Sequence, residues 1–122
     1  PYYRDQAFCL GRGATARDIL LCFLHKDEDP NSGGRQMPQH WGNKELNIVS
    51  QSSCTGTQYL QAVGTAFGLK RDGNNGVSYV SSGEGTTSEG DFHEALNWAS
   101  REKAPVIFHI HNNHSIHLIR EY

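Results

Sequence analysis

The sequence predicts an incomplete α/β fold built on a parallel sheet, with helices flanking strands near residues 77–82 and 105–111. Short apolar runs alternate with segments whose apolar residues recur at helical spacing. A strand–helix–strand unit with mostly apolar strands implies parallel strands joined by a right-handed crossover. We expect a partial domain over residues 1–122 that is truncated at both ends, because the chain begins with Pro1 and carries no signal-like segment.

Composition narrows the class of protein. A chain of 122 residues is long enough for one domain with a modest core. Its net charge of -2 leaves no basic excess to bind a nucleic-acid backbone. Mean hydropathy is -0.62, and no apolar run is long enough to span a membrane. The 3 cysteines are odd in number and widely spaced, which indicates a reducing compartment rather than a disulfide framework.

The first half of the chain predicts helix and a long loop. Residues 1–10 form a helix or a loop that is broken by the following glycines. Thr15 and Asp18 have the spacing of a capping box, so a helix is expected over residues 15–25. Residues 31–44 have loop composition, and a loop of this length is usually functional or disordered. A short strand is predicted over residues 46–50.

The second half of the chain alternates between predicted helices and predicted strands. A helix is predicted over residues 58–71, with Leu60, Val63 and Phe67 on one face. A strand follows a turn rich in Asn and Gly. Ser88 begins a second capping-box pattern, and a helix is expected over residues 89–102 before the last apolar run.

The strongest functional feature is a pair of strand ends. Gly83, Glu84 and Gly85 follow one predicted strand, and Asn112 and Asn113 follow the next. Parallel strands end at the same edge of a sheet, where open α/β sheets bind ligands. A carboxylate and an amide oxygen suit Mg²⁺, and the glycines let the backbone approach a diphosphate. The helix expected from about residue 88 would point its N–H groups towards such an anion.

This pair of motifs resembles the thiamine-diphosphate motif, Gly-Asp/Glu-Gly followed one crossover later by Asn-Asn. The surrounding residues are most similar to the alpha subunit of the decarboxylating component of branched-chain 2-oxo acid dehydrogenase complexes. Further matching stretches lie at residues 3–5, 34–40, 52–58 and 61–64. The resemblance covers nearly the whole chain, in the family's order and spacing.

The resemblance implies a thiamine-diphosphate-binding fold and specific roles for side chains. Glu84 and Asn113 would bind Mg²⁺, and Ser115 would offer it a backbone carbonyl. The residues expected to contact the cofactor are Tyr3, Arg4, Ser53, Thr55, Gly85, Thr86 and His111. A structural K⁺ site would use Ser52, the carbonyl of Cys54, Thr57 and Gln58.

The implied activity is the Mg²⁺-dependent oxidative decarboxylation of a 2-oxo acid, with acyl transfer to a lipoyl group. The expected partners are a beta subunit, in a heterotetramer, and the lipoyl acyltransferase, with neither nucleic acid nor membrane. The chain would supply cofactor-binding residues and no catalytic residue, so the fragment alone is expected to be inactive. The compartment would be the cytoplasm in a bacterium and the mitochondrial matrix in a eukaryote.

The chain departs from the family pattern after the second strand. His111 stands where some relatives have an arginine that contacts phosphate. His114 and Ser115 stand where the family usually continues towards a tyrosine, which weakens the assignment of the third metal ligand.

Other readings stay open. The enzyme could be the alpha subunit of a pyruvate or acetoin dehydrogenase. The histidines at positions 109, 111, 114 and 117 could form a zinc site in a non-catalytic metal-binding module. His40 could be an active-site neighbour or a surface residue, and Cys54 a nucleophile, although no spacing supports that role.

Overall fold

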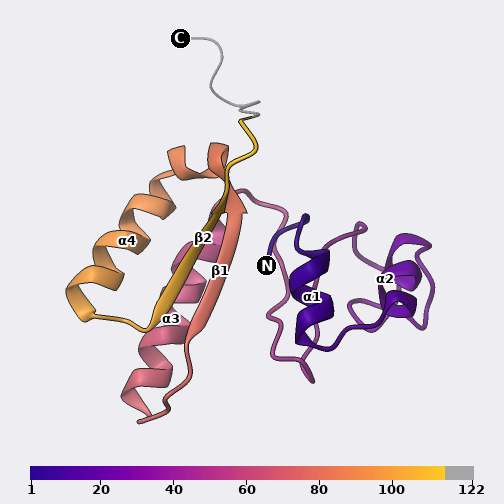
Figure 1. The fold of residues 1–122 in the computed structure, drawn as a ribbon, viewed down its shortest axis with the longest axis horizontal. Helices are drawn as coiled ribbons and strands as arrows, with labels where there is room; N and C mark the ends of the chain where they lie inside the picture. Colours follow the sequence, from indigo (N-terminus) through magenta and orange to yellow (C-terminus); the bar gives the residue numbers. More distant parts are fainter. Residues whose placement is uncertain (115–122) are drawn as a thin grey trace. The chain divides into compact units, whose positions relative to one another are not determined.

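The protein is described by a computed structural model over residues 1–114. It contains two compact units, Pro1–Ser53 and Cys54–Tyr122, the second of which is described to residue 114 (Figure 1). Each unit has its own core. No helix in the described part combines the length and the apolar character needed to cross a membrane.

The first unit contains two short helices. Helix α1 spans Gln6–Arg12 and α2 spans Ala16–Phe23. The predicted break over residues 11–13 is confirmed, because α1 continues only to Arg12. It ends at Gly13, whose left-handed φ of 114° is a conformation that glycine adopts without strain.

The capping box at the start of α2 is confirmed. The hydroxyl of Thr15 accepts from the backbone N–H of Asp18 (3.1 Å), and the carboxylate of Asp18 accepts from the N–H of Thr15 (2.8 Å). These bonds satisfy two of the backbone donors that the first turn leaves free. The predicted strand over residues 46–50 is wrong: only an isolated antiparallel bridge joins Asn43 and Ile48.

The core of the first unit forms around Trp41, which is 1% exposed. Cys9, Cys22 and Ile48 are buried with it. Its indole N–H donates to the carbonyl of Tyr2 (3.0 Å). This bond gives the one polar group of the buried ring a partner. Burial raises the pKa of the Cys9 thiol to about 11, and this thiol is therefore neutral at ordinary pH.

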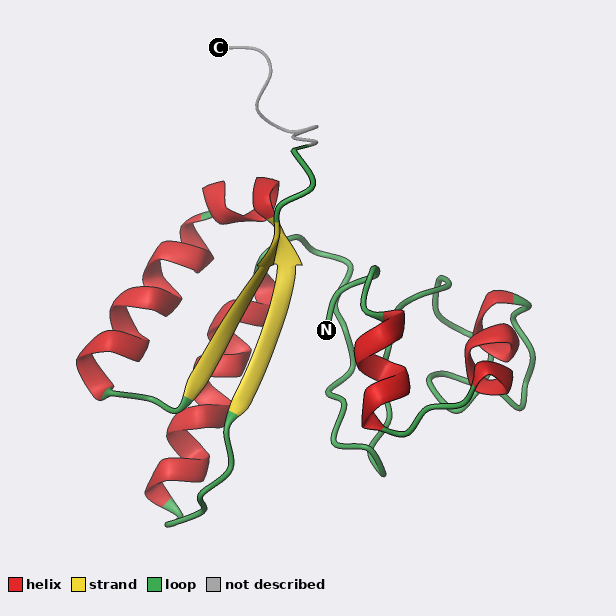
Figure 2. Ribbon diagram, viewed as in Figure 1, coloured by secondary structure: helices red, strands yellow, loops and turns green. Residues whose placement is uncertain are grey.

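The second unit is a sheet of two parallel strands with helices on one face (Figure 2). Its elements are α3 (Thr57–Arg71), β1 (Ser78–Gly83), the 3₁₀ helix η1 (Glu84–Ser88), α4 (Gly90–Glu102) and β2 (Val106–His111). The predicted α/β class and the parallel pairing are confirmed. Ser78 pairs with Val106 and Gly83 with His111, so both strands end at the same level.

Packing of α3 corrects one expected face. Tyr59, Ala62, Val63 and Ala66 are the buried residues of α3. Val63 of the expected face is buried, whereas Leu60 is 38% exposed and Phe67 is 42% exposed. Small alanines let α3 approach the sheet and α4 closely, and Tyr59 fills the space between them.

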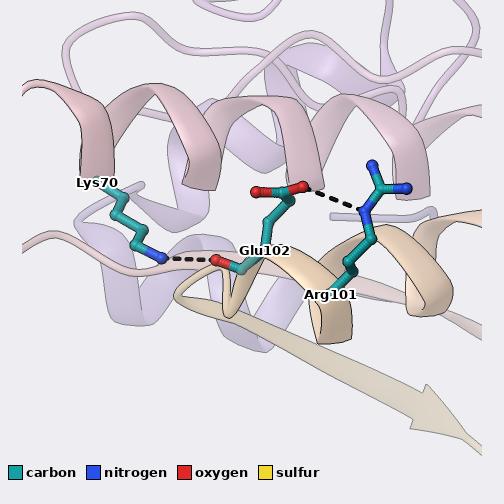
Figure 3. Close-up of polar contacts among 3 residues, drawn as sticks. All are labelled: Lys70, Arg101 and Glu102. Carbon is teal, nitrogen blue, oxygen red and sulfur yellow. Dashed lines mark hydrogen bonds and ion pairs between the residues drawn. The ribbon is translucent and has the colours of Figure 1, made fainter.

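The second predicted capping box is wrong. Residues Glu84–Ser88 form η1, so α4 begins only at Gly90, with Glu89 as N-cap and no side-chain capping bond. The ammonium group of Lys70 links α3 to the other end of α4 by donating to the carbonyl of Glu102 at 2.5 Å (Figure 3). A cation at this position also suits the negative end of the helix dipole.

Candidate functional site

The matched strand ends bring Glu84 and Asn113 together. Glu84 directly follows β1, and Asn113 lies two residues beyond β2. The backbone N–H of Asn113 lies 3.5 Å from Oε2 of Glu84, which is a long hydrogen bond across the end of the sheet. The carboxylate therefore turns towards the neighbouring strand end. The proximity expected from parallel pairing is present.

Local hydrogen bonds shape both turns. The hydroxyl of Thr87 donates to the carbonyl of Glu84 (2.6 Å), which closes the first turn of η1. The side chain of Asn112 accepts from the N–H of His114 (3.0 Å). A Cβ built on Gly85 would meet no atom of the chain within 4 Å, so the backbone at Gly85 borders open space.

Histidines line the sheet face opposite the helices. The imidazole rings of His109 and His111 lie 4.2 Å apart between centroids, and the Tyr79 hydroxyl is hydrogen-bonded to Nδ1 of His109. Within residues 1–114, no group of three His, Cys, Asp or Glu side chains is arranged to hold a metal ion. His117, the last member of the predicted zinc cluster, lies outside the described residues.

The first unit pairs His40 with Ser53. Nε2 of His40 lies 2.7 Å from Oγ of Ser53, and Nδ1 lies 3.3 Å from the carbonyl of Pro38. Because a carbonyl can only accept, Nδ1 carries the proton and Nε2 accepts from the serine hydroxyl. His40 is 9% exposed, so the alternative of a surface position is wrong.

A buried carboxylate organises the loop that carries His40. Asp29 accepts from the backbone N–H groups of Asn31, Ser32 and Gly34, and from the side chains of Asn31 and Ser32. The side-chain oxygen of Asn31 in turn accepts from the N–H of Gly42 (3.1 Å). Burial raises the pKa of Asp29, but these hydrogen bonds outweigh burial and hold the pKa below its usual value.

Comparison with known proteins decides the family. The sequence pattern of the family described as dehydrogenase E1 component matches residues 1–115. The chain belongs to the dehydrogenase E1 component family. It is similar to the 2-oxoisovalerate dehydrogenase subunit alpha of Bacillus subtilis, with 46% identity over 93% of this chain and 34% of the relative.

Two other relatives extend the comparison. The mitochondrial 2-oxoisovalerate dehydrogenase subunit alpha 2 of Arabidopsis thaliana is 42% identical over 93% of this chain and 24% of its own length. The pyruvate dehydrogenase E1 component subunit alpha of Staphylococcus epidermidis is 38% identical over 93% of this chain and 28% of its own length. The chain thus spans about a third or less of the length of these relatives.

The residues predicted to bind the E1 cofactor are divided between the two units. Tyr3 and Arg4 are exposed just before α1, and the guanidinium of Arg4 donates to the Tyr3 hydroxyl (3.2 Å). Ser53 belongs to the first unit as well. Thr55, Gly85, Thr86 and His111 belong to the second. Ser115 lies outside the described residues, so its predicted carbonyl ligand is untested.

Part of the predicted potassium site comes together at the start of α3. The Thr57 hydroxyl donates to the carbonyl of Cys54 (3.1 Å), so these two oxygens are neighbours. The amide nitrogen of Gln58 donates to the carbonyl of Ser81 on β1 (3.2 Å). Cys54 is exposed and forms no disulfide within the described residues.

Two residues at the contact between α3 and β1 escaped the sequence analysis. Tyr59 and Ser82 are fully or almost fully buried, at 0% and 1% exposed, and their hydroxyl groups are hydrogen-bonded. From the sequence alone, a tyrosine in the first turn of a helix is interpreted as an ordinary core residue. The signal that could have found the pair is Ser81–Ser82, two adjacent polar residues next to the buried Val80 in β1, which need partners once buried.

Proposed function

We propose that this chain supplies the metal- and diphosphate-binding part of a thiamine-diphosphate-dependent 2-oxo acid dehydrogenase. The observation that carries the proposal is the approach of Asn113 to the carboxylate of Glu84 at the common end of β1 and β2. Membership of the dehydrogenase E1 component family supports it.

The donor set at this strand end fits magnesium. Mg²⁺ prefers oxygen ligands in an octahedron and is usually held by one or two carboxylates together with substrate phosphates. Glu84 provides a carboxylate, and Asn113 provides a side-chain amide oxygen. Gly85 borders open space, which allows a diphosphate to approach the backbone. Thr86 follows Gly85 and His111 precedes Asn112 in the sequence, and both would donate to its oxygens.

The remaining assignments come from the family resemblance. Tyr3 and Arg4 would contact the diphosphate, and a guanidinium suits phosphate as a forked donor. Ser53 and Thr55 would lie beside the aminopyrimidine. His40, which accepts from the Ser53 hydroxyl, would orient that hydroxyl.

A potassium ion would occupy the turn before α3. Its ligands would be Ser52, the carbonyl of Cys54, Thr57 and Gln58, all through oxygen, as a hard cation requires. The neighbouring oxygens of Thr57 and Cys54 support this set. Such an ion would brace the start of α3.

The substrate is proposed to be a branched-chain 2-oxo acid. Bound thiamine diphosphate supplies the chemistry that breaks the bond between the keto carbon and the carboxylate; the chain binds and orients it. The name 2-oxoisovalerate dehydrogenase of the relatives at 46% and 42% identity favours this substrate over pyruvate. Pyruvate is the second candidate, because a pyruvate dehydrogenase subunit is 38% identical.

Partners and compartment follow the same family. We expect assembly with a beta subunit and acyl transfer to the lipoyl group of an acyltransferase. The relatives include a bacterial protein and proteins named as mitochondrial, which fits a cytoplasmic location in bacteria and a matrix location in eukaryotes.

The metal assignment can be tested by titrating Mg²⁺ calorimetrically into the protein at its natural length, with saturating thiamine diphosphate. Glu84→Gln should weaken Mg²⁺ binding by at least about 100-fold, because it removes the charged ligand. Glu89→Gln is the matched control, since Glu89 is an exposed carboxylate at the N-cap of α4 without a capping bond. Equal affinities in the two variants would contradict the proposal.

Substrate choice needs a separate assay. The assembled complex should decarboxylate 2-oxoisovalerate with a higher kcat/KM than pyruvate. The reverse order would favour a pyruvate dehydrogenase. The non-catalytic histidine-rich module would be supported instead if Zn²⁺ stayed bound through purification and was lost in a variant lacking His109, His111 and His114.

A further inference from the structure

Tyr59 lies at the centre of the second unit's core. It is in the first turn of α3 and is 0% exposed, with its ring centroid 4.9 Å from that of Phe92 and 6.0 Å from that of Phe108. Its hydroxyl is hydrogen-bonded to the hydroxyl of Ser82, the penultimate residue of β1. Burial raises the pKa of Tyr59, so the hydroxyl keeps its proton at ordinary pH.

The direction of these hydrogen bonds is fixed by proton count. Ser82 has one hydroxyl proton, and it donates that proton to the carbonyl of Gly83 (3.1 Å). Tyr59 must therefore be the donor to Ser82. The result is a directed series of bonds from the Tyr59 hydroxyl, through the Ser82 hydroxyl, to the Gly83 carbonyl.

This series ends on the peptide group that joins Gly83 to Glu84. Glycine has no side chain to restrict its backbone, so the orientation of that peptide depends on its hydrogen bonds. Gln58, the neighbour of Tyr59 on α3, donates to the carbonyl of Ser81 (3.2 Å). Two successive residues of α3, the half-buried Gln58 and the buried Tyr59, thus bond to Ser81 and Ser82 near the end of β1.

We infer that Tyr59 and Ser82 are positioning residues for the Glu84 carboxylate, whose direction they fix through the Gly83 carbonyl. The inference rests on the proposed magnesium site. Neither hydroxyl belongs to the proposed ligand set. Each acts by limiting the rotation of the backbone that carries Glu84, so their loss reduces metal affinity without removing a ligand.

The test is Mg²⁺ calorimetry on the protein at its natural length, with saturating thiamine diphosphate. Tyr59→Phe keeps the ring packing and removes only the donor, and Ser82→Ala removes the relay. Each should weaken Mg²⁺ binding about 10-fold, as is typical of groups that orient a metal ligand. Tyr79→Phe is the control, because its hydroxyl bonds His109 on the opposite sheet face.

A double-mutant cycle separates positioning from general loss of stability. If the hydroxyls act in series, Tyr59→Phe adds little to Ser82→Ala, and Ser82→Thr, which restores a hydroxyl, recovers most of the affinity. Thermal unfolding of each variant shows whether it folds. If Tyr59→Phe does not fold, the difference in Mg²⁺ affinity between Ser82→Ala and Ser82→Thr tests the positioning role.

The outcomes distinguish this inference from the proposed function. Loss of affinity in Glu84→Gln together with wild-type affinity in Tyr59→Phe and Ser82→Ala would overturn the positioning role alone. Wild-type affinity in Glu84→Gln would overturn the metal assignment, and the positioning role with it.

Discussion

Nε2 of His40 lies 2.7 Å from Oγ of Ser53, a contact between residues that are 13 positions apart in the sequence. The other ring nitrogen, Nδ1, donates to the carbonyl of Pro38, and this bond selects the tautomer in which Nε2 accepts from the serine hydroxyl. The pair joins Ser53, which the resemblance linked to the cofactor, to His40, which the sequence analysis considered as an active-site neighbour.

The pair should be energetically coupled. In a double-mutant cycle of His40→Gln and Ser53→Ala, we expect a coupling free energy of about 1 kcal/mol, the usual net value of one hydrogen bond. Urea unfolding of the wild type and the three variants measures it. Additive effects, with no coupling, would mean that the two side chains do not depend on each other in solution.

Asp29 should make stability depend on acid pH. The pKa of Asp29 is lower in the folded state than in the unfolded state. At a pH between these two pKa values, the unfolded chain therefore binds more protons than the folded chain. The stability that Asp29 contributes is present above the unfolded pKa of about 4 and is lost as pH falls through the folded pKa.

Asp29→Asn removes this titration and one acceptor oxygen. We expect a lower Tm than the wild type at pH 7, and a difference that shrinks as pH falls below about 4. Asp27→Asn is the control, because Asp27 is exposed in the same loop. A constant Tm difference across this pH range would contradict the role given to the Asp29 hydrogen bonds.

Gly56 should tolerate no side chain. Its φ is +90°, and a Cβ there would lie 3.1 Å from Cβ of Glu89. Gly56→Ala is expected to destabilise the protein by about 1–3 kcal/mol, because the backbone strain is unavoidable. Gly64→Ala is the matched control within α3: its Cβ would meet no atom within 4 Å.

The two alanine substitutions should have opposite signs. Gly64→Ala should stabilise the protein by about 0.4–1 kcal/mol, since it restricts the unfolded chain and adds helix propensity. Chemical denaturation compares both with the wild type. A Gly56→Ala variant as stable as Gly64→Ala would show that the turn before α3 relaxes freely.

Lys70 should stabilise the packing of α3 against α4. Its ammonium group donates to the carbonyl of Glu102 (2.5 Å) and to that of Lys103 (3.5 Å), at the C-terminal end of α4. Lys70→Met is expected to cost about 0.3–1 kcal/mol, and added salt should reduce this cost.

Arg71→Met is the control for Lys70. It removes the same charge from the end of α3, where the described residues give Arg71 no hydrogen bond. If both substitutions cost the same, the effect belongs to the dipole of α3 rather than to the bond across to α4. Thermal unfolding at low and high salt measures both.

The sequence predicted what depends on local pattern. Thr15 and Asp18 satisfy each other within one turn, so their spacing alone indicates the start of α2. The approach of Glu84 to Asn113 was also predictable, because the pairing of Gly83 with His111 follows from two apolar strands in parallel.

Competing local hydrogen bonds and contacts between distant segments were not predictable. Ser88 has the residue type of a cap, but the Thr87 hydroxyl bonds Glu84 and helps to fold residues 84–88 into η1, which delays α4. The bond between Tyr59 and Ser82 depends on how α3 packs against β1. The spacing of residues in the sequence does not indicate how the helix packs against the strand.

The most direct test of the central claim is a crystal structure of the protein at its natural length with thiamine diphosphate and Mn²⁺ in place of Mg²⁺. Anomalous scattering locates manganese without reference to the protein. The account predicts one Mn²⁺ bound by oxygens of both Glu84 and Asn113, about 2.0–2.3 Å away, and by the diphosphate. A manganese ion on the diphosphate with neither side chain among its ligands would contradict it.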